Sequence, residues 1–267
     1  MPLAVITGAS SGIGASFARK LAGRGYDLLL AARREDRLRA LATEIADLHK
    51  VKVEPVCVDL TNDADRDRLA ERIRHAADLG VLVNNAGFGT MGYFFETDVR
   101  GQEKMHRLHV LNTVSLTHAA LANLEPRAKA GTGVINVSSV AGFGMSPDNV
   151  SYCATKTWMN AFTQGLAIEL GTRNSPVKVQ ALCPGFTLSE FHDVLGMDRG
   201  RIPASLWMTP DFVVEESLRG FDRGKVFVVP GWRYKVMVGF MRFVPGALMR
   251  GTVVALGRRY RRKKSLV

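Results

Sequence analysis

Short apolar runs alternate with longer amphipathic stretches from the first residues of this chain almost to its end. The apolar, β-branched runs predict strands at Leu3–Thr7, Asp27–Ala32, Val51–Val58, Val81–Asn84, Gly133–Ser138, Lys178–Cys183 and Lys225–Val229. The amphipathic stretches predict helices, among them Glu35–Lys50, Asp63–Asp78, Gln102–Leu124 and Ser151–Arg173. Nearly continuous apolar strands separated by helices indicate an α/β fold, with a doubly wound parallel sheet of about seven strands and helices on both faces. No internal repeat or low-complexity linker interrupts this alternation, so we expect one domain over residues 1–231, followed by an extension over residues 232–267.

The net charge of +11 on 267 residues arises at one end of the chain. Between Trp232 and Val267 there are ten lysines or arginines and no acidic residue, which leaves 26 basic and 25 acidic residues elsewhere. This distribution gives little support to a nucleic-acid-binding function for the whole domain. The three cysteines have no metal-ligand spacing and predict a reducing compartment, and a strand that starts at Leu3 leaves no room for a signal peptide. We therefore expect a cytoplasmic protein.

A glycine-rich turn, Thr7-Gly8-Ala9-Ser10-Ser11-Gly12-Ile13-Gly14, follows the first predicted strand and opens a helix. Glycines in such a turn allow a sharp change of direction and let backbone N–H groups approach a pyrophosphate at the positive end of the helix. The spacing is Gly-x-x-x-Gly-x-Gly rather than Gly-x-Gly-x-x-Gly, and a plain strand-to-helix turn is the alternative. Its position after the first strand of an alternating β/α chain favours dinucleotide binding.

The end of the second strand distinguishes between the two nicotinamide dinucleotides. A carboxylate there binds the 2′-hydroxyl of NAD(H), whereas arginine suits the 2′-phosphate of NADP(H). Here the strand ends in alanines and is followed by Arg33 and Arg34. The alternative is that both arginines start a solvated helix with Glu35 as a local partner. We expect NADP(H), with NAD(H) less favoured.

Tyr152 precedes Lys156 by four residues, which places a phenol and an ammonium on one face of a helix. Tyr260 and Lys264 have the same spacing, but they lie in a basic tail with no preceding strand, and we interpret that pair as coincidence. The Tyr152 pair instead follows a strand that ends in two serines. A cation about 5 Å from the phenol would lower its pKa by about two, which suits proton transfer near neutral pH.

These segments together resemble the short-chain dehydrogenase/reductase family, through Thr7–Gly14, Asn84-Asn85-Ala86-Gly87, Ser138-Ser139, Tyr152–Lys156 and Pro184-Gly185 in the family's order and spacing. The resemblance covers about Leu3 to Gly231 and implies a Rossmann fold with hydride transfer to or from a nicotinamide. It also implies a catalytic set that corresponds to Asn112, Ser139, Tyr152 and Lys156. Ser139 is preferred to Ser138 because it lies thirteen residues before the tyrosine, a spacing that the family often shows.

The resemblance implies roles for these four residues and for a set that holds the nucleotide. Tyr152 would transfer the proton, Ser139 would donate to the developing oxyanion, and Asn112 would hold a water that links Lys156 to solvent. Lys156 would also bind the nicotinamide ribose. The implied nucleotide-binding residues are Gly8, Ser10, Ser11, Gly12, Ile13, Gly14, Arg33, Arg34, Asp59, Leu60, Asn85, Ala86, Gly87, Tyr152, Lys156, Pro184, Gly185, Phe186, Thr187 and Ser189.

Two of these assignments, and two residue types near them, have an alternative interpretation or depart from the family pattern. Asp59 could instead cap the next helix. Ser189 stands where the family usually has threonine, so a hydroxyl is kept. His106 and His109 lie three residues apart on a predicted helix, but no carboxylate or cysteine pattern joins them, and we expect no metal. Cys153, beside the tyrosine, is interpreted as a packing residue.

A substrate lid is expected over about residues 186–210, where this family usually places one. Its apolar side chains, and those of other loops near the expected site, predict a hydrophobic ketone or aldehyde substrate: Phe186, Phe191, Leu195, Met197, Trp207, Met208, Phe88, Phe143 and Met145. Several of them could simply pack the lid onto the domain. We favour an NADP(H)-dependent carbonyl reductase. The alternatives are an NAD-linked alcohol dehydrogenase and a non-catalytic NADP(H)-binding sensor or scaffold.

Two kinds of partner are expected besides the small-molecule substrate. Family members commonly pair the helices predicted at Gln102–Leu124 and Ser151–Arg173, which suggests a homodimer or homotetramer. After Trp232, three apolar runs separated by single arginines precede six basic residues between Arg258 and Lys264. No run is long enough to cross a membrane, so either peripheral docking on anionic lipid or packing on the protein explains this segment.

Overall fold

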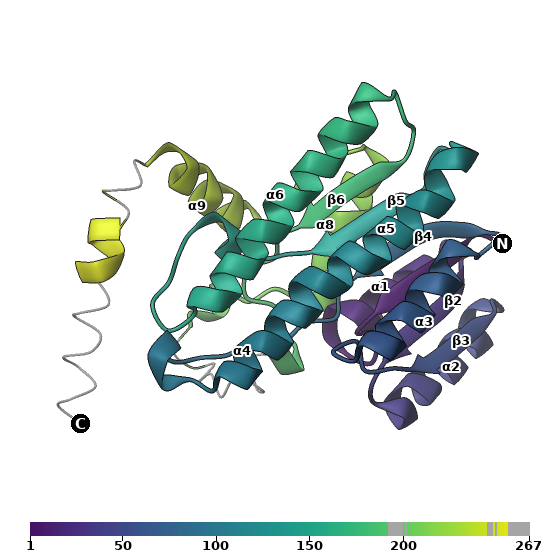
Figure 1. The fold of residues 1–267 in the computed structure, drawn as a ribbon, viewed down its shortest axis with the longest axis horizontal. Helices are drawn as coiled ribbons and strands as arrows, with labels where there is room; N and C mark the ends of the chain where they lie inside the picture. Colours follow the sequence, from purple (N-terminus) through teal and green to yellow (C-terminus); the bar gives the residue numbers. More distant parts are fainter. Residues whose placement is uncertain (192–199, 201, 245–247, 249, 256–267) are drawn as a thin grey trace.

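A computed structural model describes residues 1–191, 200, 202–244, 248 and 250–255. Several residues considered above therefore lie outside the described part of the chain: Leu195, Met197, Tyr260, Lys264 and the rest of the basic cluster. The chain forms a seven-stranded sheet in the order β3-β2-β1-β4-β5-β6-β7, and all neighbouring strands are parallel (Figure 1). The strands are β1 Leu3–Thr7, β2 Asp27–Ala32, β3 Val53–Cys57, β4 Leu79–Asn84, β5 Gly133–Val137, β6 Lys178–Leu182 and β7 Phe227–Val228. The expected fold class is confirmed.

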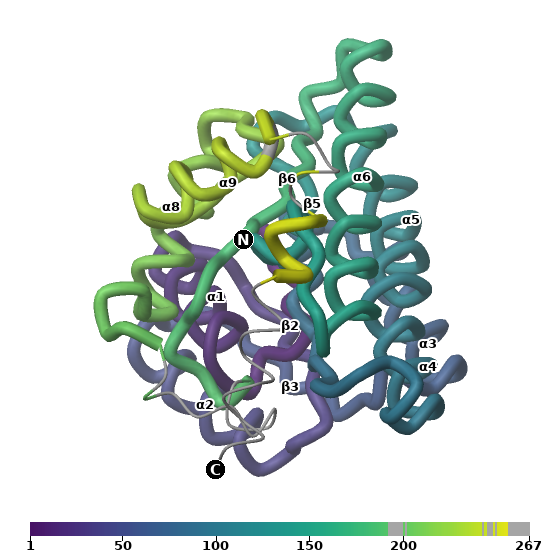
Figure 2. The backbone as a smooth tube through the Cα atoms, turned by 90° about the vertical axis from the view of Figure 1, so that its left-hand side faces the viewer, coloured from purple at the N-terminus to yellow at the C-terminus, as the bar shows by residue number. Residues whose placement is uncertain are grey.

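Helices cover both faces of the sheet (Figure 2). One layer consists of α1 Gly12–Ala22, α2 Glu35–His49 and α8 Pro210–Asp222, and the other of α3 Asp63–Arg74, α4 Val99–His106, α5 Asn112–Leu124 and α6 Val150–Thr172. Each layer buries its own apolar cluster, one around Phe17 and Ile45, the other around Leu116 and Ile73. Because strand side chains alternate between the faces, Ile6 joins the first cluster and Val5 the second.

The element boundaries depart from the predicted ones where local capping or strand pairing decides. The predicted helix at Gln102–Leu124 begins earlier, at Val99, because the Asp98 side chain accepts the N–H groups of Arg100 and Gly101. A π-helical turn, Arg107–Leu111, then joins α4 to α5. The last strand, predicted over Lys225–Val229, keeps only two residues, because β7 pairs with β6 at the sheet edge for that length.

A further helix, α9, spans Trp232–Phe243 at the start of the expected C-terminal extension. Its inner side buries Tyr234 and Val238, so this part of the extension packs on the domain. Within the described ranges, no helix is long and apolar enough to cross a membrane.

Candidate active site

The predicted site residues gather at one edge of the sheet because all seven strands are parallel and their carboxyl ends meet there. The glycine-rich turn follows β1, the two arginines follow β2, and Asp59 follows β3. The Asn85-Ala86-Gly87 segment follows β4, Ser139 follows β5, and Pro184–Ser189 follows β6. β1 pairs with both β2 and β4, which makes it the point where the strand order reverses. In open α/β sheets, ligands bind at this point.

The glycine-rich turn has the geometry that a nucleotide phosphate needs. Gly8 and Gly12 have φ angles of +64° and +55°, a conformation that other residues rarely adopt. A Cβ on Gly14 would lie 2.3 Å from the Gly8 carbonyl oxygen, so only glycine lets α1 start this close to β1. The Ser10 and Ser11 side chains lie beside the start of α1, whose N-cap is Ser11.

The segment after β4 is tied directly to this turn. The Asn85 side chain donates to the carbonyl oxygens of Thr7 and Gly8, at 2.9 and 3.1 Å. The Thr7 hydroxyl accepts the backbone N–H groups of Asn85 and Ala86, both at 3.0 Å. The structure therefore brings together two of the motifs that the sequence placed 77 residues apart.

Arg34, the N-cap residue of α2, reaches back to the glycine-rich turn. Its Nε and Nη2 atoms donate to the Ser10 hydroxyl at 3.3 and 3.1 Å, and Nη2 donates to the Ser11 hydroxyl at 2.8 Å. Its Nη1 atom pairs with Glu190 at 2.7 Å. The alternative that Glu35 is its local partner is wrong, because Glu35 pairs with Arg39 one turn along α2.

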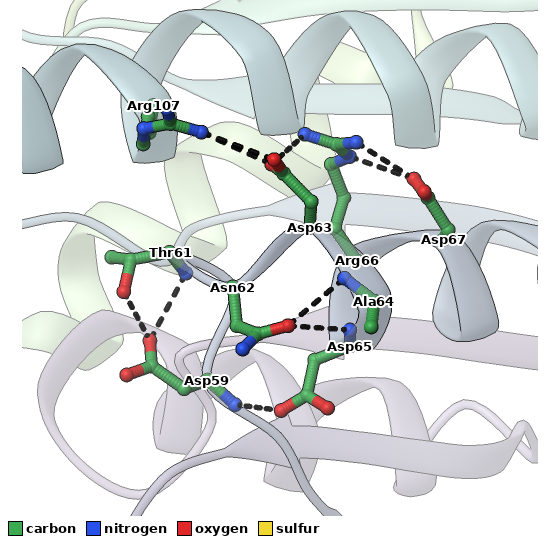
Figure 3. A network of polar contacts seen from close by, with 9 residues as sticks. All are labelled: Asp59, Thr61, Asn62, Asp63, Ala64, Asp65, Arg66, Asp67 and Arg107. Atoms are coloured by element: carbon green, nitrogen blue, oxygen red, sulfur yellow. Dashed lines mark hydrogen bonds and ion pairs between the residues drawn. The ribbon is translucent and has the colours of Figure 1, made fainter.

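Asp59 belongs to a polar network at the start of α3 (Figure 3). Its carboxylate accepts the backbone N–H and the hydroxyl of Thr61, and its own N–H donates to Asp65. Burial raises the pKa of Asp59, but the bonds from Thr61 and the nearby charges of Arg33 and Lys104 outweigh it and lower the pKa.

The capping alternative for Asp59 is not what the structure shows, because Asn62 is the N-cap of α3 and accepts the N–H groups of Ala64 and Asp65. Leu60, the other residue of this pair, lies in the apolar core under α3, so only its backbone is available to a ligand.

Ser139, Tyr152 and Lys156 lie together at the end of β5 and on α6, and the fourth predicted catalytic residue, Asn112, starts α5. Lys156 donates to the Val137 carbonyl oxygen at 2.8 Å, and its Nζ lies 5.6 Å from the centre of the Tyr152 ring. Ser139 lies near enough to Tyr152 to act on the pKa of its phenol, while its hydroxyl donates to the Pro184 carbonyl oxygen at 3.4 Å and caps the short helix after β5. Asn112 is buried, and its Oδ1 atom has no hydrogen-bond partner among the described residues.

Burial controls the acid–base properties of this cluster. It raises the pKa of Tyr152 to about 12, although the nearby Ser139 acts in the opposite direction. It also lowers the pKa of Lys156 to about 8, against a smaller opposing effect from Cys183. The expectation that Lys156 lowers the pKa of Tyr152 is therefore wrong when only the protein's own groups act on it. Both charged forms lose hydration in the interior, and this loss exceeds their mutual attraction.

His109 is a neighbour of Tyr152 that the sequence analysis considered only as a metal ligand. Its ring meets the Tyr152 ring edge-on at 5.8 Å, and its Nδ1 atom lies 2.9 Å from the Thr155 hydroxyl. That hydroxyl donates to the Tyr152 carbonyl, so Nδ1 carries the proton, and Nε2 has no partner within the described structure. The sequence feature that could have placed His109 in this cluster is its position one helical turn before Asn112. The described residues contain no group of three or more His, Cys, Asp or Glu placed to hold a metal.

Among the described residues of the expected lid, Phe191 has a side chain that contacts this cluster. Phe191 lies 5.7 Å from the Tyr152 ring, whereas Phe186 packs on Trp207 and Phe143 on Phe227. Phe186 and Trp207 therefore pack on each other within the expected lid, and Met208 packs on the apolar cluster of the domain, as the alternative held for part of the set.

Tyr234 of α9 holds the two ends of the lid region together and was missed by the sequence analysis. Its hydroxyl accepts the Phe186 N–H at 3.0 Å and donates to the Leu206 carbonyl at 2.8 Å.

Comparison with known proteins supports this geometry. Residues 2–199 match the short chain dehydrogenase family. The 3-oxoacyl-[acyl-carrier-protein] reductase FabG of Aquifex aeolicus is 29% identical over 86% of this chain and 96% of its own. A short-chain dehydrogenase from Sphingobium yanoikuyae, solved in complex with NADPH, is 34% identical with a TM-score of 0.82, over 92% of this chain and 97% of its own. A bulky-bulky ketone specific alcohol dehydrogenase from Comamonas testosteroni is 30% identical with a TM-score of 0.77, over 92% of this chain and 96% of its own.

The parallel sheet, the glycine-rich turn at its reversal point and the tyrosine–lysine cluster beside that turn define an NAD(P)-dependent oxidoreductase of the Rossmann type. The match over residues 2–199 gives the family: the chain belongs to the short-chain dehydrogenases.

Proposed function

We propose that this protein is an NADP(H)-dependent carbonyl reductase that acts on a hydrophobic ketone or aldehyde. The proposal rests on the Ser139–Tyr152–Lys156 cluster together with Arg34 at the end of β2, whose guanidinium donates to the hydroxyls of the glycine-rich turn. An arginine fork at the end of β2 suits a 2′-phosphate, and the strand ends in alanines rather than in a carboxylate. The NADPH-bound relative from Sphingobium yanoikuyae supports this cofactor.

The residues at the sheet edge fit the dinucleotide. Gly8, Gly12 and Gly14 leave room for a pyrophosphate at the start of α1, and Asn85 holds this turn in place. Asp59 and the backbone of Leu60 would border the adenine. Pro184–Ser189 would contact the nicotinamide side together with Lys156. When bound, the reduced cofactor supplies the hydride.

The protein's own groups supply the proton and stabilise the negative charge that grows on the carbonyl oxygen. Tyr152 is fully protonated at neutral pH, since its pKa is about 12, and is therefore ready to donate. Ser139 can donate a hydrogen bond to the same oxygen. As Tyr152 gives up its proton, the Lys156 ammonium is 5.6 Å from the ring and stabilises the phenolate. We assign a water to the unpartnered Asn112 Oδ1 as the route by which the proton is replaced.

The hydrophobic substrate class is proposed from the side chains around Tyr152. Phe191 and His109 border its ring, and Phe88 lies beside His109. The His109 imidazole is kept neutral, because burial first, and then the charges of Lys156 and His106, hold its pKa well below the ordinary value. Such walls favour an apolar group next to the reacting carbonyl. The ketone-specific relative from Comamonas testosteroni agrees with this class.

Two interactions complete the proposal. We assign a homodimer or homotetramer to the paired outer faces of α5 and α6. We also assign peripheral contact with anionic lipid to α9 and the basic residues that follow it, in a cytoplasmic protein.

The test of the function is a panel of ketones, aldehydes and alcohols, read by NADPH and NADH absorbance with wild-type protein and with Tyr152→Phe. We expect NADPH-dependent reduction of apolar carbonyls and a loss of roughly 10² to 10⁴ in turnover in the variant, with NADPH binding retained. Tyr26→Phe, a half-buried tyrosine at the other end of β2, is the matched control. Full activity in Tyr152→Phe would refute the mechanism. Preferential oxidation of alcohols with NAD would favour the dehydrogenase alternative. Nucleotide binding without turnover would favour the sensor or scaffold alternative.

A further inference from the structure

Glu190 occupies the arginine fork proposed for the 2′-phosphate. Its two carboxylate oxygens pair with Arg34, at 2.7 Å, and with Arg37, one turn further along α2. Glu190 follows Ser189, in the segment after β6, and reaches Arg34 across 156 residues of chain. Hydrogen bonds from Arg34 and then from Arg37 lower the pKa of Glu190 to about 2, so the carboxylate is charged at neutral pH.

With this carboxylate, each of the three nitrogens of the Arg34 guanidinium donates a hydrogen bond. Nε and Nη2 donate to the serine hydroxyls of the glycine-rich turn, and Nη1 donates to Glu190. A phosphate monoester dianion would require the same donors, and beside Glu190 it would also meet a negative charge. A 2′-hydroxyl, by contrast, can donate a hydrogen bond to a carboxylate, the usual way in which NAD(H) is held.

We propose that Glu190 is an internal competitor of the adenosine 2′-phosphate and so determines how strongly this protein prefers NADP(H) to NAD(H). The inference rests on the proposed role of Arg34 in the function above. The Glu190 carboxylate has to leave Arg34 before a 2′-phosphate can bind the guanidinium. A nucleotide with a free 2′-hydroxyl, by contrast, can bind while Glu190 stays paired with Arg34.

The same contact links the nucleotide to the substrate side of the site. Phe191, the residue after Glu190, lies 5.7 Å from the Tyr152 ring. On the other side, Ser189 Cβ lies 3.0 Å from the position that a Cβ on Gly12 would occupy. Displacement of Glu190 by a 2′-phosphate therefore acts on a short segment that touches both the glycine-rich turn and the catalytic tyrosine.

The experiment measures binding of 2′,5′-ADP and of 5′-ADP by calorimetry at low salt, so that activity is not required. Four proteins are compared with wild type: Glu190→Gln, Arg34→Ala, Arg37→Ala and Glu44→Gln. Glu44 is the matched control, since it is an exposed glutamate in a two-bond ion pair with Arg19, away from the strand carboxyl ends. Because exposed ion pairs are weak, we expect Glu190→Gln to bind 2′,5′-ADP about three- to tenfold more tightly, while 5′-ADP binding is unchanged or weaker.

The outcomes separate this inference from the proposed cofactor preference. Weaker or unchanged 2′,5′-ADP binding in Glu190→Gln would overturn the competitor role, provided that Arg34→Ala loses affinity for 2′,5′-ADP. If Arg34→Ala leaves the binding of both 2′,5′-ADP and 5′-ADP unchanged, the proposed NADP(H) preference itself fails. An equal gain in Glu44→Gln would show a general effect of charge and would likewise overturn the role of Glu190. Thermal melts of each variant confirm folding, which these exposed positions should not disturb.

Discussion

Lys156 is a buried amine that donates a hydrogen bond to the Val137 carbonyl oxygen. Burial lowers its pKa to about 8, well below the value near 10.5 of a lysine in an unfolded chain. A charged lysine at this position therefore reduces the stability of the fold, a cost that fits the role proposed for this amine beside Tyr152. The conflict between stability and function at this residue can be measured.

The sign of the pH dependence follows from the two pKa values. Between pH 8 and 10.5 the unfolded chain holds more protons at this site than the folded protein does, so the free energy of unfolding rises with pH. We expect wild type to gain up to about 2 kcal/mol relative to Lys156→Met between pH 7.5 and 9.5, measured by urea denaturation. The raised pKa of Tyr152 has the opposite effect, but only above pH 10.

Lys52→Met, which alters an exposed lysine before β3, serves as the control. Its curve of unfolding free energy against pH should run parallel to that of wild type over this range. Parallel curves for wild type and Lys156→Met would contradict the lowered pKa.

At the scale of helices and strands, most of the fold could be predicted because apolar periodicity reports burial. β1 and β4 are buried almost throughout, and their uninterrupted apolar runs were readable without a structure. The π-helical turn at Arg107–Leu111 was not readable, since one extra residue in a turn leaves no clear mark on an amphipathic pattern.

The candidate site divides in the same way. Residues within motifs, such as Tyr152 and the glycine-rich turn, were predicted from their spacing. Contacts between distant segments were not, because no local pattern specifies which side chains meet. The pairing of Glu190 with Arg34 and that of Tyr234 with Phe186 belong to this second group.

Two neighbouring helices carry a pattern that neither burial nor catalysis explains. In Figure 1, α5 and α6 lie side by side on the outside of the sheet. Each exposes a line of largely uncharged residues at helical spacing: Val114, His118 and Ala122 along α5, preceded by Leu111 of the π-helical turn, and Ala154, Ala161, Gly165 and Ile168 along α6. Small residues at these positions let a second helix approach closely. Such faces favour pairing with a second copy across a two-fold axis.

We expect Ile168→Glu to convert a dimer or tetramer into smaller species, since it places a charge on this face. Sedimentation velocity at micromolar concentration measures the change. Leu48→Glu, which alters a similarly exposed leucine on α2, should keep the wild-type mass. A wild-type protein that sediments only as a monomer would contradict the assembly.

At the scale of the whole molecule, positive charge and exposed apolar surface coincide at one end of the chain. The outer face of α9 exposes Trp232, Val236, Phe240 and Phe243, which fall on one side of the helix. Arg233 and Lys235 flank this side, and the chain continues with further basic residues and no acidic ones. The inner face of the same helix holds both ends of the lid region through Tyr234. A surface that bound α9 would therefore lie next to the expected lid.

Docking on anionic lipid is expected to need both the apolar face and the cations. We predict that wild-type protein floats with vesicles containing phosphatidylglycerol at low salt. With vesicles of pure phosphatidylcholine it should remain at the bottom of the gradient. Phe240→Ser/Phe243→Ser should lose flotation. A chain ending at Gly257 should bind more weakly and with less salt dependence, because each cation near the surface contributes about 1 kcal/mol. This shorter truncation keeps Tyr234, which a chain ending at Gly231 would remove.

Leu48→Ser supplies the matched control, an exposed leucine on α2 whose loss should leave flotation unchanged. If the double variant floats like wild type, the α9 face does not bind lipid. If it instead lowers the mass seen in sedimentation while wild type fails to float, the face is covered by a second copy of the chain. Sedimentation and flotation of the same two proteins therefore decide what the exposed side of α9 contacts.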